Sequence, residues 1–147
     1  VVPGAIDHSN FWTGQVPERY REREFFQYNA QNLLMRTNAD EMDELGRAFA
    51  ERLNGAKGPI RVLVPLEGYS EHTKRKTYDL AENELGNWKQ PETDRAFSRA
   101  LGENLTSGTV EEIPCHINDA AFADACVAAF LEVIGSAPGG TRTSGAA

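Results

Sequence analysis

Three side chains that could do chemistry stand together in PCHIND, residues 114–119, between a strand-like run and an apolar helical pattern. His116 could act as a general acid or base, because an imidazole titrates near neutral pH. Asn118 and Asp119 could orient a ligand. The same residues also fit a structural role, with Asn118 as the N-cap of the following helix and Asp119 complementing the helix dipole. We predict His116 as a catalytic candidate, while Asn118 and Asp119 are candidates both for ligand binding and for starting the helix.

A second candidate group is Arg36, Thr37 and Asn38, where an apolar run passes into a helical pattern. A helix N-terminus offers unpaired N–H groups and partial positive charge, and an arginine adds a bidentate donor for phosphate or carboxylate. We therefore predict that the three residues bind an anion. The alternative is that Thr37 or Asn38 caps the helix and Arg36 pairs with a carboxylate of the protein.

Two further loops carry candidates. Asp7, next to His8, is a second possible acid or base, although a plain Asx-turn explains it as well. In PLEGYS, Gly68 would let the backbone approach a ligand beside Ser70, but a loop glycine is also an ordinary turn signal. Spacing gives little support to a metal held by the three histidines, so we predict no metal site.

Composition and absent motifs narrow the function. The net charge of −7 argues against a nucleic-acid backbone as the main partner, because counterion release needs clustered Lys and Arg. The sequence has no P-loop, no GxGxxG and no HExxH motif. No apolar run approaches the ~18 residues of a membrane span. The only cysteines are Cys115 and Cys126, which we expect to be reduced thiols, as in a cytoplasmic protein.

These candidates must be positioned by strands that alternate with helices. An Asn38–Glu41 capping box predicts a helix that ends at about Asn54, and Pro91 suits the first turn of another. The third expected helix covers about residues 118–134, and residues 20–26 read as a solvated helix. We expect strands at residues 1–2, 31–36, 60–66 and 109–113. The charged stretch 67–90 is too long for an ordinary connection, so we expect it to be functional or mobile.

This alternation predicts an α/β fold, a Rossmann-like parallel sheet flanked by helices. Ligands of such sheets bind outside the carboxyl ends of the strands, so Asp7, Arg36, Gly68 and His116 should meet at one edge. Val1 and Val2 read like the end of a strand already under way. We therefore expect residues 1–135 to form an incomplete, fragment domain, completed by a missing N-terminal part or by another copy in a homo-oligomer. The Gly-rich residues 136–147 should form a disordered tail.

Several stretches together carry a family resemblance: VPGAID, NLLMRTNADEMDELGRAFAERLN, GPIRVLVPLEGYS and HINDAAFADA. They resemble the tomato mosaic virus resistance protein-like family over roughly residues 1–131. The resemblance implies an ATP-binding domain, with ATP and Mg²⁺ as cofactors, and two Rossmann-like subdomains, of which this chain matches the latter part of the second. The chain departs from the family pattern at Asp7-His8 and in the charged loop 71–89.

Three functions follow as hypotheses. The first is a nucleotide- or phosphometabolite-binding domain that holds a small anionic ligand at the carboxyl edge of its sheet. The second is an enzyme that acts on a small carboxylate or carbonyl compound by acid/base chemistry, using Asp7 or His116. The third, suggested by the plant member of the family, is a non-catalytic protein-interaction module.

Overall fold

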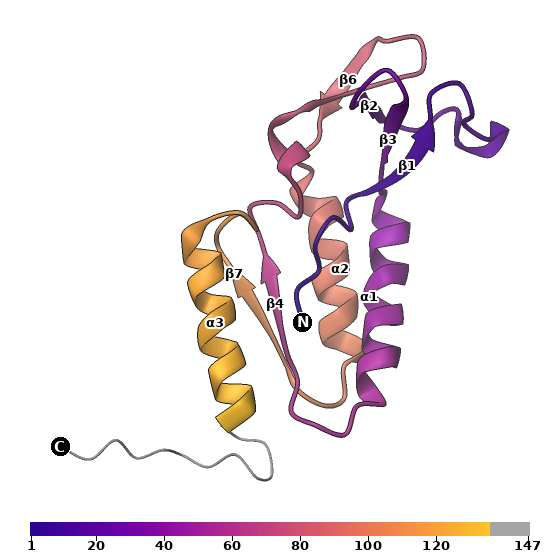
Figure 1. Cartoon of the computed structure of the whole chain (residues 1–147). Coiled ribbons are helices and arrows are strands. Elements are labelled where there is room, and N and C mark those ends of the chain that lie inside the picture. Colours follow the sequence, from indigo (N-terminus) through magenta and orange to yellow (C-terminus); the bar gives the residue numbers. More distant parts are fainter. Residues whose placement is uncertain (136–147) are drawn as a thin grey trace.

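A computed structural model describes residues 1–135; the expected tail, residues 136–147, lies outside the described residues. Figure 1 shows two parts, an upper antiparallel sheet and a lower layered body. The upper part is built from β1 (His8–Trp12), η1 (Glu18–Tyr20), β2 (Phe25–Gln27), β3 (Asn32–Arg36), η2 (Glu71–Lys74), β5 (Lys76–Tyr78) and β6 (Glu84–Asn87). The lower part contains α1 (Ala39–Asn54), β4 (Arg61–Pro65), α2 (Pro91–Asn104), β7 (Thr109–Ile113) and α3 (Ala120–Gly135).

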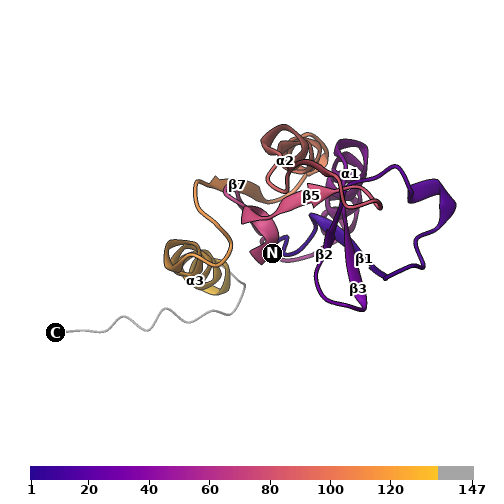
Figure 2. The same ribbon diagram turned by 90° about the horizontal axis from the view of Figure 1, so that it is seen from above.

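The lower body has three layers around a parallel strand pair. β4 and β7 pair in parallel from Arg61↔Thr109 to Pro65↔Ile113, as the α/β prediction requires. Alternation along β4 sends Val62 and Val64 into a core with α1 and α2, while Leu63 packs against α3 on the other face. The fold is therefore α/β, with helices on both faces of a parallel pair (Figure 2).

The expected strand at residues 31–36 is present as β3, but its predicted parallel alignment with residues 60–66 is wrong. β3 is antiparallel to both β1 and β2, in a five-stranded sheet with the order β1-β3-β2-β5-β6. The reason is a tight turn before it. Asn29 Oδ1 accepts hydrogen bonds from the backbone N–H groups of Gln31 and Asn32, and so short a connection can join only antiparallel strands.

Two other segments differ from expectation. Residues 67–90 form η2 and the β5–β6 hairpin, which extend the upper sheet, so the stretch is neither a simple loop nor a structureless one. Residues 20–26 are not a helix. Instead η1 ends at Tyr20 and β2 begins at Phe25, because Phe25 belongs to an apolar cluster with Leu33 and Met35 of β3.

The helix starts follow local chemistry. Asn38 caps α1 in a full capping box with Glu41, and Pro91 occupies the first turn of α2, as predicted. The third helix begins at Ala120, later than expected, and Asn118 is not its cap. Asp119 precedes the helix: its carbonyl accepts the N–H of Ala123, and its side chain accepts the N–H of His116 at 2.8 Å.

Candidate functional site

Asp7 is the centre of a polar cluster at the junction of the two parts. Its carboxylate is 2% exposed and accepts hydrogen bonds from Ser70 Oγ at 2.7 Å and Trp88 Nε1 at 2.8 Å, with His8 Nδ1 at 3.1 Å. Burial raises the pKa of the Asp7 carboxyl, but the hydrogen bonds from His8, Ser70 and Trp88 outweigh it and hold the net pKa below its usual value. Asp7 is therefore ionised at neutral pH, so His8 Nδ1 is the donor in their contact.

The backbone beside Asp7 is fixed by Thr37, just after β3, and by the loop after β4. Thr37 donates from its N–H to the carbonyl of Asp7 at 3.0 Å and from Oγ1 to the carbonyl of Ile6 at 2.8 Å. Ala5, which has a φ of 54°, donates its N–H to the carbonyl of Tyr69 at 2.8 Å. These bonds set the direction in which the Asp7 side chain leaves the chain.

Arg36 is buried beneath this cluster, and protein acceptors engage all three of its nitrogens. Nε donates to the carbonyl of Trp88 at 2.8 Å, and Nη1 donates to the carbonyls of Asp7 and Thr37 at 3.2 and 3.0 Å. Nη2 donates to the carboxylate of Asp94. Burial raises the pKa of Asp94, and the charge of Arg36 opposes that shift. An external anion would have to displace these acceptors to reach Arg36.

His8 and His72 form the accessible part of the site. Their rings meet edge to face, with centroids 5.3 Å apart, and both rings also lie against Trp88. Within residues 1–135, neither ring nitrogen of His72 nor Nε2 of His8 has a hydrogen-bond partner. Burial, followed by the charge of His8, lowers the pKa of His72. The cluster thus presents two partly buried imidazoles, and within residues 1–135 three of their four ring nitrogens, all except Nδ1 of His8, are available to a ligand.

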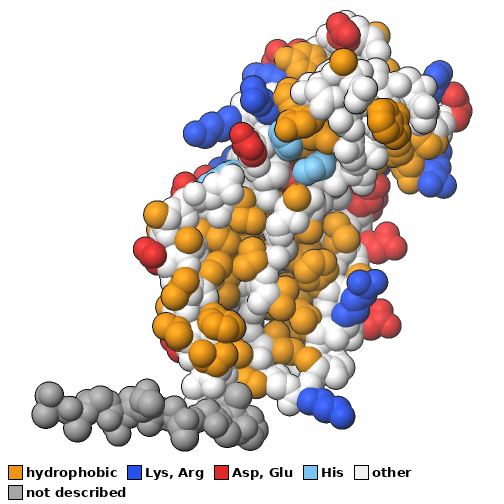
Figure 3. All heavy atoms as spheres, viewed as in Figure 1, with side chains coloured by type: hydrophobic (Ala, Val, Ile, Leu, Met, Phe, Trp, Pro, Cys, Tyr) orange, Lys and Arg blue, Asp and Glu red, His pale blue; other side chains and the backbone are white. Residues whose placement is uncertain are grey.

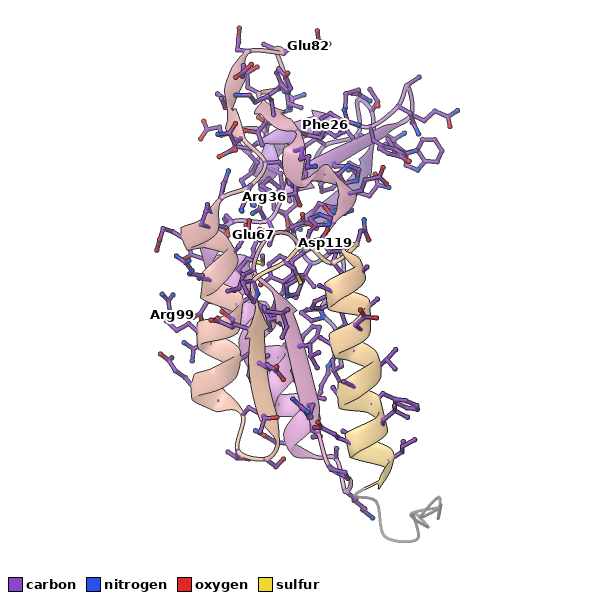
Figure 4. The ribbon with its side chains drawn as sticks, turned by 90° about the vertical axis from the view of Figure 1, so that its left-hand side faces the viewer. Phe26, Arg36, Glu67, Glu82, Arg99 and Asp119 are labelled. Carbon is purple, nitrogen blue, oxygen red and sulfur yellow. The ribbon has the colours of Figure 1, made fainter. Side chains whose placement is uncertain are left out.

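The aromatic surround is completed by β2 and the residue after it. Phe26 lies 5.7 Å and Tyr28 lies 5.5 Å from the ring of His72, measured between centroids. The guanidinium of Arg75, just after η2, lies 5.4 Å from the centre of the Phe26 ring. Figure 3 shows histidine side chains at the waist between the upper and lower parts, and Figure 4 shows Phe26 in the upper part, above Arg36.

His116 has both ring nitrogens in use. Nε2 lies 2.9 Å from the carbonyl oxygen of Ser70, which can only accept, so Nε2 carries the proton. Nδ1 then accepts the N–H of Asn118 at 3.1 Å. These partners select the neutral Nε2–H tautomer, and the His116 ring connects the loop after β4 to the loop after β7 by hydrogen bonds.

Gly68 allows this close contact between the two loops. It has a φ of +142°, and a Cβ there would lie 2.1 Å from Thr73 Oγ1 and 2.8 Å from His116 Cδ2. Its carbonyl accepts the N–H of Ile117 at 3.1 Å. The close approach allowed by this glycine is to another loop of the same protein.

The expected convergence of Asp7, Arg36, Gly68 and His116 at one edge is therefore seen. Contacts run from Arg36 to Asp7, from Asp7 to Ser70, and from Ser70 to His116. The remaining candidates lie at helix starts. Asn38 is engaged in the α1 capping box, and Asn118 and Asp119 are at the exposed start of α3; Figure 4 shows Asp119 and Glu67 just below Arg36.

Sequence reasoning missed three members of the cluster, Trp88, Asp94 and His72. A tryptophan within the charged stretch GNWKQ is a signal that could have marked a buried residue, since Trp88 is only 1% exposed. Asp94 looked like an ordinary first-turn acid of α2. His72 carried no signal beyond its residue type.

Three other features bear on this cluster: cavities, possible metal ligands and membrane-spanning helices. A cavity of about 680 Å³ lies between the segment after β1 and the β5–β6 hairpin and touches the cluster only through Phe26. Within the described part of the chain, no group of three His, Cys, Asp or Glu residues is placed to hold a metal ion. The same residues include no helix long and apolar enough to cross a membrane.

Comparison with known proteins places the chain. Residues 1–134 match the C-terminal domain of an uncharacterised protein family, UPF0261. The chain is 36% identical over 134 residues to a UPF0261 protein of Rhizobium meliloti, covering 88% of this chain and 31% of the relative. It is 35% identical over 126 residues to a UPF0261 protein of Clostridium tetani, covering 84% of this chain and 29% of that protein.

A plant protein belongs to the same group of relatives. The ToMV resistance protein Tm-1(GCR237) of Solanum lycopersicum is 33% identical over 136 residues, which are 88% of this chain and 17% of the plant protein. The chain thus spans a third or less of the length of these curated relatives. On the extent of the family match, the chain belongs to the UPF0261 family and corresponds to its C-terminal domain.

Proposed function

We propose that this domain binds a small anionic metabolite, of the phosphorylated or nucleotide class, at the junction of its two parts and exchanges a proton with it through His8. One observation carries the proposal: a buried, ionised Asp7 bonds one nitrogen of His8, while Nε2 of the same ring and both nitrogens of His72 have no partner among residues 1–135. Unused imidazole nitrogens that share one partly buried place favour a ligand there.

The Asp7–His8 pair has the arrangement of an oriented base. An ionised carboxylate that accepts from Nδ1 fixes the tautomer with a lone pair on Nε2, and it stabilises the imidazolium that forms when Nε2 takes a proton. Asp7 is a positioning residue in this proposal, and His8 is the catalytic one. Arg36, Thr37 and Ser70 hold Asp7 in place, and Gly68 and His116 join the two loops beneath it.

The surroundings suit an anion with a planar group. Lys74 and Arg75, two and three positions after His72, are exposed and form no ion pair within the described residues. The faces of Phe26 and Tyr28 next to His72 offer a surface on which a nucleobase could stack. Because its pKa is lowered, His72 is neutral at pH 7 and can donate or accept a hydrogen bond. ATP with Mg²⁺ is accordingly the first ligand to test.

The test is a thermal-shift titration of the 147-residue chain with ATP, with and without Mg²⁺, with inorganic pyrophosphate and with citrate. Selective binding stabilises the folded chain by mass action, by ~2.7 kcal/mol when the ligand is at a hundredfold excess over its Kd. The melting temperature rises accordingly. The ring proton signals of His8 and His72 should shift in NMR spectra with the same ligand, and those of His116 should not.

Two variants test the place of binding. His8→Gln should weaken the ligand-induced shift of the His72 ring signals, and Asn10→Ala, an exposed change on the same strand, should leave that shift unchanged. Thermal stabilisation by a ligand that leaves both accessible histidines unshifted would overturn the proposed site. No stabilisation by any of the compounds would overturn the ligand class and favour an interaction module.

A further inference from the structure

The outward face of α3 is apolar, and no other part of residues 1–135 covers it. Val127, Phe130, Leu131 and Ile134 are 58%, 62%, 58% and 45% exposed, while the opposite side of the helix packs on Leu63 through residues such as Phe122 and Ala129. Figure 3 shows the hydrophobic side chains spread over this helix and its surroundings. A helix that is apolar on nearly all sides is normally buried on nearly all sides, and contiguous exposed apolar surface marks an interaction site.

Beside α3, the outer edge of β4 is only partly paired. The N-terminal amine of Val1 donates to the carbonyl of Arg61 at 2.7 Å, and the N–H of Leu63 donates to the carbonyl of Val1 at 3.0 Å. This is the bonding pattern of parallel strands with Val1 opposite Val62. Val1 thus lies opposite the second residue of β4, beside which Figure 1 places the N-terminus, so the outer edge before this point, beginning with the N–H of Arg61, has no strand beside it in residues 1–135.

The edge and the helix are joined by a shallow apolar hollow of about 170 Å³. Its lining includes Val2, Ile60, Leu63, Ala129, Phe130 and Val133. An occupant of this hollow would therefore contact the open strand edge and the exposed helix face at the same time. The occupant must supply backbone hydrogen bonds on one side and apolar side chains on the other.

We propose that this face docks a strand–helix unit of the UPF0261 polypeptide from outside the C-terminal domain, with its strand parallel to β4 and leading toward Val1, and its helix against Phe130 and Leu131. The direction follows from the bonds of Val1, which continue only a parallel strand. A second copy of this chain related by a twofold axis would bring its β4 alongside antiparallel, so it does not fit. The family has the material for such a unit, since the matched region is 31% of the length of the Rhizobium meliloti relative.

The test is to co-express this chain with the region that precedes the matched domain in the Rhizobium meliloti relative, and to measure their association by co-purification and titration. The two should form a one-to-one complex. The double change Phe130→Asp with Leu131→Asp should weaken it about tenfold or more, as for central apolar contacts of an interface. Hydrogen exchange of the Arg61 amide should slow in the complex, because that amide points the same way as the Arg61 carbonyl.

Leu85→Asp is the matched control, because Leu85 of β6 is a comparably exposed apolar side chain, 53% accessible, in the upper sheet. Circular dichroism should show that both the control and the α3 variant keep the wild-type fold, since the changed residues are exposed. Equal weakening by the two variants, or no complex at all, would overturn the proposal. Self-association of the chain alone that the α3 variant abolishes would also overturn it, in favour of a second copy.

Discussion

Replacing Arg36 by alanine tests whether this residue supports the fold or binds a ligand. The substitution removes a side chain that is 2% exposed and bonds three backbone carbonyls and the carboxylate of Asp94, itself only 13% exposed. Removing one partner of a buried ion pair costs ~3–5 kcal/mol, because the other charge is left uncompensated. The total stability of a domain is only about 5–15 kcal/mol, so the loss is large.

Urea unfolding followed by Trp fluorescence and circular dichroism measures this effect. Trp88 is a direct reporter, since the guanidinium of Arg36 lies 5.8 Å from its ring centre. At ~2–4 °C for each kcal/mol in a chain of roughly this size, the melting temperature of Arg36→Ala should fall by roughly 6–20 °C. Arg47→Ala is the control: Arg47 pairs with Asp43 on the exposed surface of α1, and its loss should leave unfolding unchanged within error.

The pH dependence of the deficit separates a lost charge pair from lost packing. In Arg36→Ala, the buried Asp94 keeps the burial that raises its pKa and loses the cation that opposes it. Protonation then removes the uncompensated charge, so the difference from wild type should shrink as the pH falls toward 4. An Arg36→Ala protein that unfolds at the wild-type urea concentration, but no longer binds anions, would refute this reasoning and restore Arg36 as the ligand anchor.

Three further outcomes can be measured by the same unfolding assays. Gly46→Ala should destabilise the chain by ~1–3 kcal/mol despite better helix propensity, because its Cβ would lie 2.5 Å from the carbonyl oxygen of Phe97 in α2. Gly102→Ala should stabilise the chain by up to ~1 kcal/mol, because within the described part of the chain no atom of another element lies within 4 Å of the added Cβ; equal effects of the two substitutions would contradict the clash. Asn38→Ala should cost ~1 kcal/mol through loss of the α1 cap, and no change would mean that water replaces it. The folded-state pKa of His72 is lowered, so its contribution to the free energy of unfolding is complete above its unfolded pKa of ~6.5 and is lost as the pH falls below that value. His72→Gln should remove this part of the pH dependence of stability.

The parts of the fold that sequence predicted are those fixed by near neighbours. Asn38 and Glu41 satisfy each other within one turn, so the start of α1 can be read from four residues. Pro91 marks the first turn of α2 because its ring fixes φ there. The parallel pairing of β4 with β7 followed from the helix between them, since such a crossover returns the chain in the same direction.

The direction of β3 was not predictable from its own residues. An apolar run such as NLLM is as compatible with a parallel as with an antiparallel neighbour, and the choice was made by the turn at Asn29 and by the pairing of β1 across the strand. The burial of Trp88 likewise depends on a hydrogen bond to Asp7, which lies 81 positions away. Neither the direction of β3 nor the burial of Trp88 is marked by a pattern in the neighbouring sequence.

The predicted site residues meet at one edge, but only two of the four do so for the predicted reason. The loops with Gly68 and His116 meet because each follows one strand of a parallel pair, as the sheet rule requires. Asp7 and Arg36 reach the same edge by another route, through antiparallel pairing that sets His8 opposite Arg36. That register places the ring of His8, rather than that of His116, against His72, with no hydrogen-bond partner for Nε2 among residues 1–135. Since His116 uses both ring nitrogens to hold two loops together, the proton exchange that we propose is assigned to His8 and not to His116.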